Sequence, residues 1–218
     1  MNTEIRTTAR LTGAALRALL VLTLVCGVIY PLLITGVAQA LFNDKANGSE
    51  IEKDGKTVGS SLYGQTYDLP KKNPDDPEEA PRPDPKWFQP RPSAAGTNSV
   101  NTQYSILLSG ASNLAADSKV LKDAVVERRQ AYAELNGVKE SQVPVDALTA
   151  SASGIDPHIS PENAELQAAR VAKANGLRGA AVEKLVKDHT QGRIAGFIGD
   201  PRVNVLELNI ALQDLVRN

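Results

Sequence analysis

Residues 19–42 have the sequence LLVLTLVCGVIYPLLITGVAQALF, and this stretch decides how the rest of the chain is organised. No residue from Ala18 to Asn43 carries a charge. A helix needs about 20 apolar residues to cross a hydrocarbon core of about 30 Å, so the stretch is long enough to span a membrane. We therefore predict one transmembrane helix over residues 18–42.

The charges that flank this helix predict its orientation. Three arginines and a single acidic residue precede it within residues 1–17, whereas charges of both signs follow it. Because an excess of basic residues stays on the cytoplasmic side, we expect residues 1–17 in the cytoplasm and residues 43–218 outside it, as one exported soluble domain. The predicted location is the cell membrane, with a single span and a cytoplasmic N-terminus.

A cleaved signal peptide is the alternative interpretation of the same stretch. Ala38-Gln39-Ala40 has the A-x-A pattern of a cleavage site. The apolar core of a signal peptide is about 7–15 residues long, however, and the apolar run before Ala38 is longer than that. A retained anchor is therefore favoured.

Small residues within the predicted span suggest contacts with other helices. Thr23 and Gly27, and likewise Gly36 and Ala40, are pairs of small residues separated by three positions. Such pairs let two helices approach closely in a membrane, although small residues also occur in any lone anchor. We predict that Gly27 and Gly36 contact partner helices.

Composition excludes several classes of protein. The chain has 24 basic and 25 acidic residues, a balance that excludes a nucleic-acid binder with a broad basic face. A single cysteine excludes an internal disulfide framework and any zinc or iron–sulfur site built from cysteines. The part after the span is long enough for one compact domain with its own core.

Periodicity and capping residues predict an α+β domain in which several helices back a small sheet. The expected helices begin at caps such as Ser118 and Ser160 and end at glycines. They run over residues 118–137, 160–176, 182–192 and 204–215, and the expected strands cover residues 56–64, 87–89 and 193–198.

Residues 68–86, DLPKKNPDDPEEAPRPDPK, cannot belong to the core. This segment holds six prolines and ten charged residues in nineteen positions. Because it cannot bury apolar surface, we expect an extended, polyproline-like insertion at the surface. A solvated spacer is favoured over an acidic docking loop.

The sequence contains no recognisable catalytic site. It lacks the motifs G-x-G-x-x-G, H-E-x-x-H and G-x-S-x-G, and Gly55-Lys56-Thr57 is not preceded by a glycine at the spacing that a phosphate-binding loop needs. The two histidines, His158 and His189, have no neighbours spaced as metal ligands. We therefore predict no catalytic residue and no metal site, and a free-standing enzyme is disfavoured.

Several longer runs are specific enough to suggest a family. In this order, and behind one N-terminal span, they resemble the KdpC family, the C chain of the potassium-transporting Kdp P-type ATPase. The runs are Tyr30–Gly36, Val58–Gln65, Trp87–Ser93, Ser112–Leu114, Val143–Ser160, Pro161–Val171 and Gly199–Leu206.

The resemblance implies a non-catalytic accessory subunit of an ATP-driven, high-affinity potassium importer. Its partners would be the ATP-hydrolysing and the channel-like subunits, and it would stabilise their complex. The family is also described as a catalytic chaperone that raises the ATP affinity of the ATP-hydrolysing subunit. The alternative is a purely structural, membrane-anchored cap over the pore-forming subunit, with no nucleotide contact.

On the chaperone interpretation, ATP would be a ligand shared with the ATP-hydrolysing subunit, and no cofactor would be tightly bound. The resemblance then implies nucleotide contacts from Ser109, Gly110, Ser112 and Asn113. The predicted topology argues against direct contact, because it exports this domain while ATP is bound in the cytoplasm.

The segment from Val143 to Val171 is predicted to dock on a partner. Small residues are dense from Thr149 to Gly154, and they let another backbone approach closely. We predict that Ser151, Ala152, Gly154 and His158 contact a partner subunit. The alternative is a tight internal turn of the domain itself.

Overall fold

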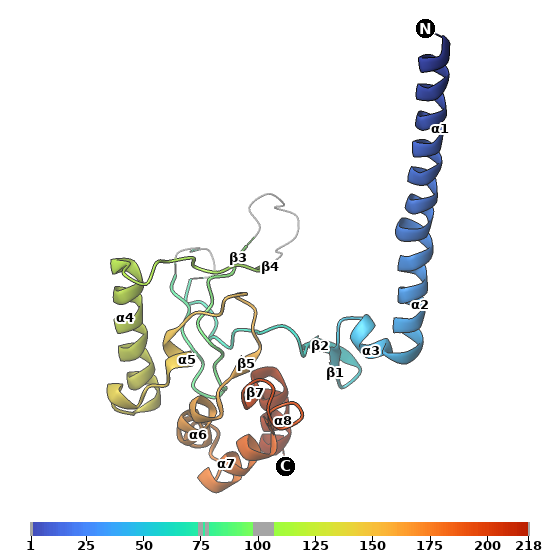
Figure 1. The fold of residues 1–218 in the computed structure, drawn as a ribbon. Helices are drawn as coiled ribbons and strands as arrows, with labels where there is room; N and C mark the ends of the chain where they lie inside the picture. Colours follow the sequence, from blue (N-terminus) through green and yellow to red (C-terminus); the bar gives the residue numbers. More distant parts are fainter. Residues whose placement is uncertain (1, 74–75, 77–78, 98–106, 218) are drawn as a thin grey trace. The chain divides into compact units, whose positions relative to one another are not determined.

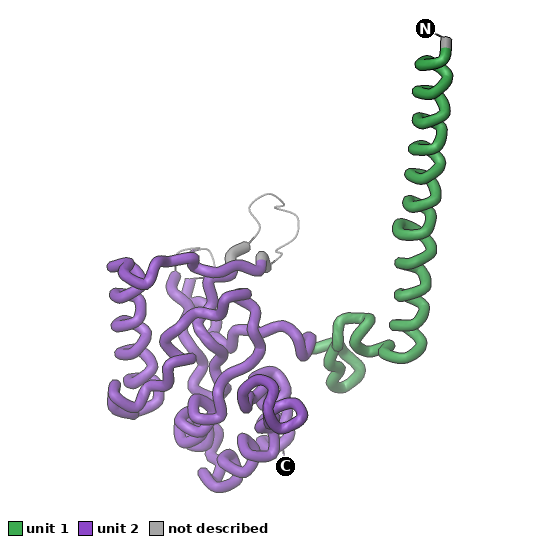
Figure 2. Tube along the Cα trace, viewed as in Figure 1, with its two compact units in different colours: residues 1–58 green, residues 59–218 purple. Residues whose placement is uncertain are grey.

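The structure is a computed structural model of the chain, and it describes residues 2–73, 76, 79–97 and 107–217. The chain divides into two compact units, Met1–Val58 and Gly59–Asn218 (Figure 2). The first unit contains a long helix and most of a hairpin, whereas all the buried side chains of the described residues belong to the second unit.

The long helix of the first unit is continuous through its proline. Helix α1 (Asn2–Leu24) passes into one π-helical turn, η1 (Val25–Ile29), and then into α2 (Tyr30–Leu41) (Figure 1). A proline lacks an N–H group, and its ring clashes with the carbonyl group four residues earlier. For Pro31 that carbonyl belongs to Gly27, within the wider π turn, so the helix accommodates the proline where its hydrogen-bond pattern has already changed.

The apolar surface of this helix is uncovered. Residues Thr3–Leu41 form a helix of 39 residues that contains a window of mean hydropathy 2.4, and none of that window is buried. By length and composition the helix suffices to cross a membrane. A signal sequence would meet the same criteria, so the retained anchor and its limits at residues 18–42 stay predictions.

A hairpin follows the helix. After α3 (Asn43–Ala46), strand β1 (Glu50–Lys53) pairs with β2 (Lys56–Ser60). The strands are joined by Asp54 and Gly55, which have φ values of 53° and 73°, as a tight two-residue turn requires. The strand predicted over residues 56–64 therefore ends at Ser60, and its partner strand was not predicted.

The core of the second unit lies between three helices and a small sheet (Figure 1). The sheet has the order β5 (His158–Ile159), β7 (Arg202–Asn204) and β6 (Thr190–Gln191), and both pairings are antiparallel. The helices are α6 (Pro161–Asn175), α7 (Gly179–Asp188) and α8 (Val205–Arg217). The buried cluster consists of Phe88, Ile159, Ala164, Ala168, Val171, Ala172, Val182, Val186, Val203, Val205, Leu208 and Leu212.

Capping residues set the helix ends as predicted. The hydroxyl of Ser160 accepts a hydrogen bond from the Asn163 N–H at 3.1 Å, at the start of α6. Ser118 caps α4 (Lys119–Asn136), and the side chain of Asn204 caps α8. Helices α4 and α6 end at left-handed glycines, and the α+β fold class is confirmed.

The remaining elements lie on the α4 side of this unit. Strands β3 (Gly96–Thr97) and β4 (Leu107–Leu108) form an antiparallel pair, and η2 (Glu140–Gln142) and α5 (Val145–Leu148) follow α4. Helix α4 contacts both α5 and α6.

The strand predicted at residues 87–89 is wrong, although Phe88 is fully buried in the core. The Phe88 N–H donates to the side-chain oxygen of Asn209 at 2.9 Å, and the Phe88 carbonyl accepts from the Asn209 amide at 3.0 Å. One amide side chain on α8 thus satisfies both backbone groups that a neighbouring strand would have paired.

The strand predicted at residues 193–198 is also wrong. Helix α7 ends at Asp188, before the predicted Gly192, and strand β6 follows directly. Residues 193–199 then form a tight turn, closed by an isolated bridge between Ile194 and Ile198. Ala195 and Gly196 have φ values of 53° and 83°, which a strand does not allow.

The described part of the 68–86 insertion lies at the surface, and its polyproline-like conformation stays a prediction. Its two arms run side by side, because the Leu69 N–H donates to the Arg82 carbonyl at 2.8 Å. Helix α6 holds the base of the insertion: Arg170 donates to the Pro85 carbonyl at 2.6 Å, and Asn175 donates to the Lys86 carbonyl at 2.8 Å.

Candidate functional site: the loop between α5 and β5

Residues 149–157, which connect α5 to β5, contact four other segments of the second unit through backbone hydrogen bonds of 2.8–2.9 Å. The loop therefore lies at a junction of the domain. The bonds run from Ser151 N–H to the Pro92 carbonyl, from Gly110 N–H to the Ser153 carbonyl, from Gly64 N–H to the Ile155 carbonyl and from Val205 N–H to the Pro157 carbonyl.

Two of the predicted docking residues point into the domain. Ser151 is 3% exposed, and its hydroxyl oxygen accepts from the Gly154 N–H at 3.1 Å. Gly154 is buried with a φ of 72°, and a Cβ atom placed there would lie 2.6 Å from the Gly110 carbonyl oxygen. The small residues thus let a backbone of the same chain approach closely. Ala152 and Ser153 remain exposed at the tip of the loop.

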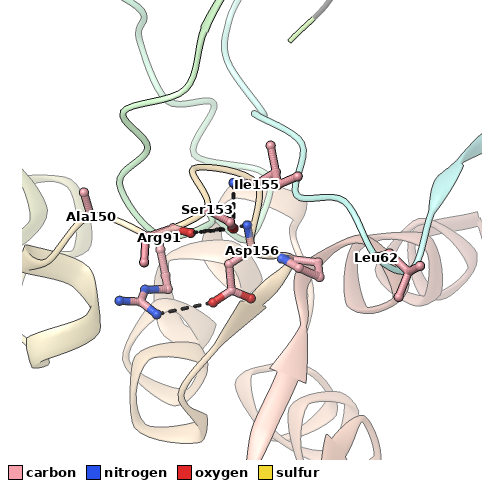
Figure 3. A pocket seen from close by; sticks show the side chains of 9 residues that line it. Leu62, Arg91, Ala150, Ser153, Ile155 and Asp156 are labelled. Carbon is pink, nitrogen blue, oxygen red and sulfur yellow. Dashed lines mark hydrogen bonds and ion pairs between the residues drawn. The ribbon is translucent and has the colours of Figure 1, made fainter. Parts of the chain in front are cut away.

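Asp156 joins the loop to two basic side chains. Its carboxylate lies 3.3 Å from Nη1 of Arg91 (Figure 3). It also lies 3.2 Å from Nδ1 of His158. The pKa of Asp156 is lowered, chiefly by the hydrogen bond with the His158 side chain, while partial burial acts in the opposite direction. His158 therefore serves the loop as a hydrogen-bond partner of Asp156, and its contact with another subunit stays a prediction.

Two hollows lie on either side of this loop. The smaller has a volume of about 580 Å³ and is lined by the loop and Leu62 (Figure 3). The larger, about 1100 Å³, extends from the loop to α4 and the prolines of residues 81–92. Arg91, Ser151 and Asp156 line both hollows, so they form the wall between them. Among the described residues, no group of three or more His, Cys, Asp or Glu side chains could hold a metal ion.

The residues implied in nucleotide contact adjoin this loop. The Ser109 hydroxyl and the Gly110 N–H both donate to the Ser153 carbonyl at 2.8 Å, so these two donors are already engaged. Ser112 and Asn113 are exposed, and Asn113 has a φ of 49°. Contact between this run and ATP stays a prediction.

The two glycines of the predicted anchor have open faces. A Cβ atom at Gly36 would meet nothing within 4 Å, and at Gly27 it would meet only the Thr23 methyl group at 3.9 Å. Their contact with partner helices is untested and stays a prediction.

Sequence reasoning missed a polar network on the buried face of α6. Gln167 is 1% exposed: its side-chain oxygen accepts from the Gln89 N–H at 2.7 Å, and its amide donates to the Gln89 carbonyl at 3.1 Å. Asn163 is equally buried and accepts from the Tyr132 hydroxyl at 2.8 Å. The network fixes the segment that carries Arg91 against α6. In the sequence, this network could have been recognised from Asn163, Gln167 and Arg170, whose spacing places three polar side chains on one face of the helix.

Arg170 completes this network as a buried cation. It is 8% exposed, and the described acceptors of its guanidinium are neutral: the carbonyls of Pro85 and Trp87 and the side chains of Asn136 and Gln167. Burial lowers the pKa of Arg170 to about 10. The arginine ties α4, α6 and the base of the insertion together.

Comparison with known proteins identifies the family. The family model described as K+-transporting ATPase, c chain, matches residues 12–214. The chain belongs to the KdpC family. The match extends over the long helix and over the domain with the α5–β5 loop, so both units are part of the KdpC pattern.

Relatives named potassium-transporting ATPase KdpC subunit match along nearly the whole chain. A KdpC protein of Streptomyces avermitilis is 58% identical over 222 residues, which cover 99% of each chain. One from Streptomyces coelicolor is 55% identical, over 99% of this chain and 97% of the relative. A Mycobacterium tuberculosis relative is 44% identical over 92% of this chain and 96% of its own length.

Membership settles the general role. A KdpC chain is a subunit of the potassium-transporting ATPase and is not its catalytic subunit. The single long apolar helix among the described residues is compatible with a single-pass membrane protein.

Proposed function

We propose that this KdpC chain is an accessory subunit that stabilises an ATP-driven potassium importer from the extracytoplasmic side of the cell membrane. The anchor helix would pack on helices of the partner subunits, and the domain would rest on the channel-like subunit. The observation that carries this proposal is the uncovered helix, whose most apolar window has no buried residue. Such a surface needs lipid or other helices around it.

Gly27 and Gly36 are the proposed contact points of the helix. Both lie in the uncharged stretch and leave room for a neighbouring backbone. The excess of arginine within residues 1–17 supports a cytoplasmic N-terminus. The exposed tip of the α5–β5 loop, Ala152 and Ser153, is a proposed contact of the domain.

The assembly role can be tested by purifying the ATPase through a tag on its ATP-hydrolysing subunit. Full-length chains with Gly27→Ile or Gly36→Ile should co-purify less than the wild-type chain. Gly13→Ile is the matched control, because Gly13 also has nothing within 4 Å but lies before the uncharged stretch. Unchanged co-purification of both variants would contradict helix packing at these glycines.

Topology has a separate test. In a Cys26→Ser background, Ser49→Cys introduces a single cysteine after the helix. A membrane-impermeant maleimide should label it from outside intact cells. Labelling only after the membrane is permeabilised, when the reagent can reach the cytoplasmic side, would contradict the proposed orientation. In the purified protein, an intact mass that corresponds to a chain beginning at Leu41 would indicate a cleaved signal peptide.

A second candidate function is the catalytic chaperone, which would raise the ATP affinity of the ATP-hydrolysing subunit. The observation that favours it is the exposed pair Ser112 and Asn113. Direct contact with ATP would require this domain to face the cytoplasm, opposite to the orientation proposed above. In the assembled ATPase, Ser112→Ala with Asn113→Ala should then raise KM for ATP and leave kcat unchanged. Val126→Ser, at an exposed position of α4, is the control. An unchanged KM would favour the purely structural role.

A further inference from the structure

The turn at residues 193–199, between β6 and β7, exposes three large apolar side chains. Ile194 is 58% exposed, Phe197 is 74% exposed and Ile198 is 51% exposed. Among the described large hydrophobic residues of the second unit, Phe197 has the highest exposed fraction. Single exposed apolar residues are ordinary on protein surfaces, but here three lie within five positions of one turn, two of them paired in an isolated bridge.

The backbone of this turn is closed on itself. The Ile194 N–H donates to the Ile198 carbonyl at 2.9 Å, and the Ile198 N–H donates back to the Ile194 carbonyl at 3.0 Å. The N–H groups of Gly196 and Phe197 also donate within the turn. Because these polar groups are paired inside the turn, a partner can cover the tip without leaving them unsatisfied.

The conformation of the turn holds its side chains outward. Ala195 has a φ of 53°, in a region that residues with a Cβ atom rarely adopt. Strain of this kind persists only where the surroundings enforce it, and here the reciprocal bonds of Ile194 and Ile198 do so. A fixed turn loses little conformational entropy on binding, which favours a preformed contact surface.

The charges beside the patch indicate what covers it. Arg193 lies 3.5 Å from Asp200, and the Asp200 side chain is 91% exposed. This pair leaves no net charge next to the apolar side chains. An anionic lipid surface attracts unpaired basic residues and would repel the exposed carboxylate. A protein interface, in contrast, combines an apolar aromatic centre with a polar rim.

We propose that the 193–199 turn is a docking surface for the channel-like subunit of the potassium-transporting ATPase, and that Phe197 inserts into an apolar pocket of that subunit. The inference rests on the proposed assembly function and names a surface that the sequence did not indicate. The partner surface would be apolar at its centre and polar around it, to match Phe197 and the Arg193–Asp200 pair.

Photo-crosslinking in membranes that contain the whole ATPase tests the contact. The photoreactive residue p-benzoylphenylalanine is placed at position 197, and at position 120 as a control, because Val120 is 64% exposed on α4, outside the segments proposed to dock. We expect a cross-link from position 197 to the channel-like subunit and none from position 120. Cross-linking from position 197 to lipid alone, to a second copy of this chain, or to nothing, would overturn the proposal.

A matched pair of full-length variants measures the strength of the contact. After dilution, the fraction of ATPase that retains this chain should be about tenfold lower for Phe197→Ser than for the wild-type chain. Removal of a central aromatic residue typically weakens an interface by this much. Val120→Ser, at an exposed position of α4, should leave that fraction unchanged. If the wild-type chain itself fails to co-purify, the proposed assembly function fails. If the wild-type chain and Phe197→Ser are retained equally, only the docking surface fails.

Discussion

The α5–β5 loop and the 193–199 turn use small and large residues in opposite ways. The first is rich in serine, alanine and glycine, yet four other segments bond to its backbone and Ser151 and Gly154 are buried. The second carries isoleucine and phenylalanine, yet its backbone N–H groups at Ile194, Gly196, Phe197 and Ile198 donate within the turn and these side chains are exposed.

This difference shows that residue size alone does not locate an interface. Small residues permit close approach, but the approaching backbone can belong to the same chain, as the Gly110 carbonyl beside Gly154 does. Large apolar residues usually enter the core, but a tight turn with positive φ values keeps Phe197 outside it. Conformation, and not composition, separates the inward loop from the outward turn.

The largest expected effect is on stability, at Gly154. Gly154→Ala combines a φ of 72° with a Cβ atom 2.6 Å from the Gly110 carbonyl oxygen. We expect a loss of about 3 kcal/mol or more, a fall in Tm on the order of 10 °C for a unit of this size. Thermal unfolding of the full chain, followed by circular dichroism, measures it.

The control for this variant lies in the other turn. Gly196→Ala has a similar φ of 83° but nothing within 4 Å of the added Cβ atom. It should lower the free energy of unfolding by only about 1–2 kcal/mol. Equal losses at both glycines would mean that the inward loop is not closely packed.

The next effect is a difference in stability between two variants of neighbouring loop residues, Ser151 and Ala152. Ser151→Gln adds bulk at a buried position and displaces the acceptor of the Gly154 N–H, so we expect a loss of about 3 kcal/mol. Ala152→Gln adds the same side chain at an exposed position and should leave Tm unchanged. If Ala152→Gln nevertheless weakens the assembled ATPase, the tip of the loop contacts a partner. A Ser151→Gln chain with unchanged Tm would contradict the inward packing.

A smaller effect depends on pH. The lowered pKa of Asp156 means that its carboxylate stabilises the fold at pH values above the unfolded pKa of about 4, and this contribution is lost as the pH falls through the folded pKa. The Tm difference between wild type and Asp156→Asn should therefore be largest near neutral pH and shrink below pH of about 4. A difference that does not vary with pH would contradict this electrostatic role.

The smallest effect on stability is expected at Phe197. Because this side chain is 74% exposed, Phe197→Ser should change the free energy of unfolding by no more than about 0.5 kcal/mol. Its effect should appear in assembly instead. A Tm that falls by several degrees would mean that Phe197 packs against the domain. This result would contradict our conclusion that the 193–199 turn faces outward.

The sequence predicted α4, α6 and α8 well because their ends depend on local chemistry, whereas α7, which has no side-chain cap, begins and ends earlier than predicted. Ser160 and Asn204 cap helices through their own side chains, and Gly176 ends α6 in a left-handed conformation. These signals lie within a few residues of the element they define. The long apolar helix was also visible from its uncharged length, although it begins at Asn2 and not at residue 18.

The strands and the site could not be predicted in the same way. Phe88 is paired by Asn209, 121 positions later, so no local pattern indicates that its neighbour is a side chain and not a strand. Likewise, Ser153 meets Gly110 through a contact across the sequence, and Arg91 reaches Asp156 from another segment. Only the folded domain brings these residues together.

Hydrogen–deuterium exchange of the full chain, alone and in the assembled ATPase, tests most directly whether one loop faces inward and the other outward. The account predicts that the amides of residues 149–151 and 154–158, on either side of the exposed tip, are protected in the free chain and change little on assembly. Amides of residues 193–199 are hydrogen-bonded only within an exposed turn that can open locally, so they should be less protected than the loop in the free chain and should slow down on assembly. Fast exchange at 149–151 and 154–158 in the free chain with protection on assembly, and no change at 193–199, would contradict the account.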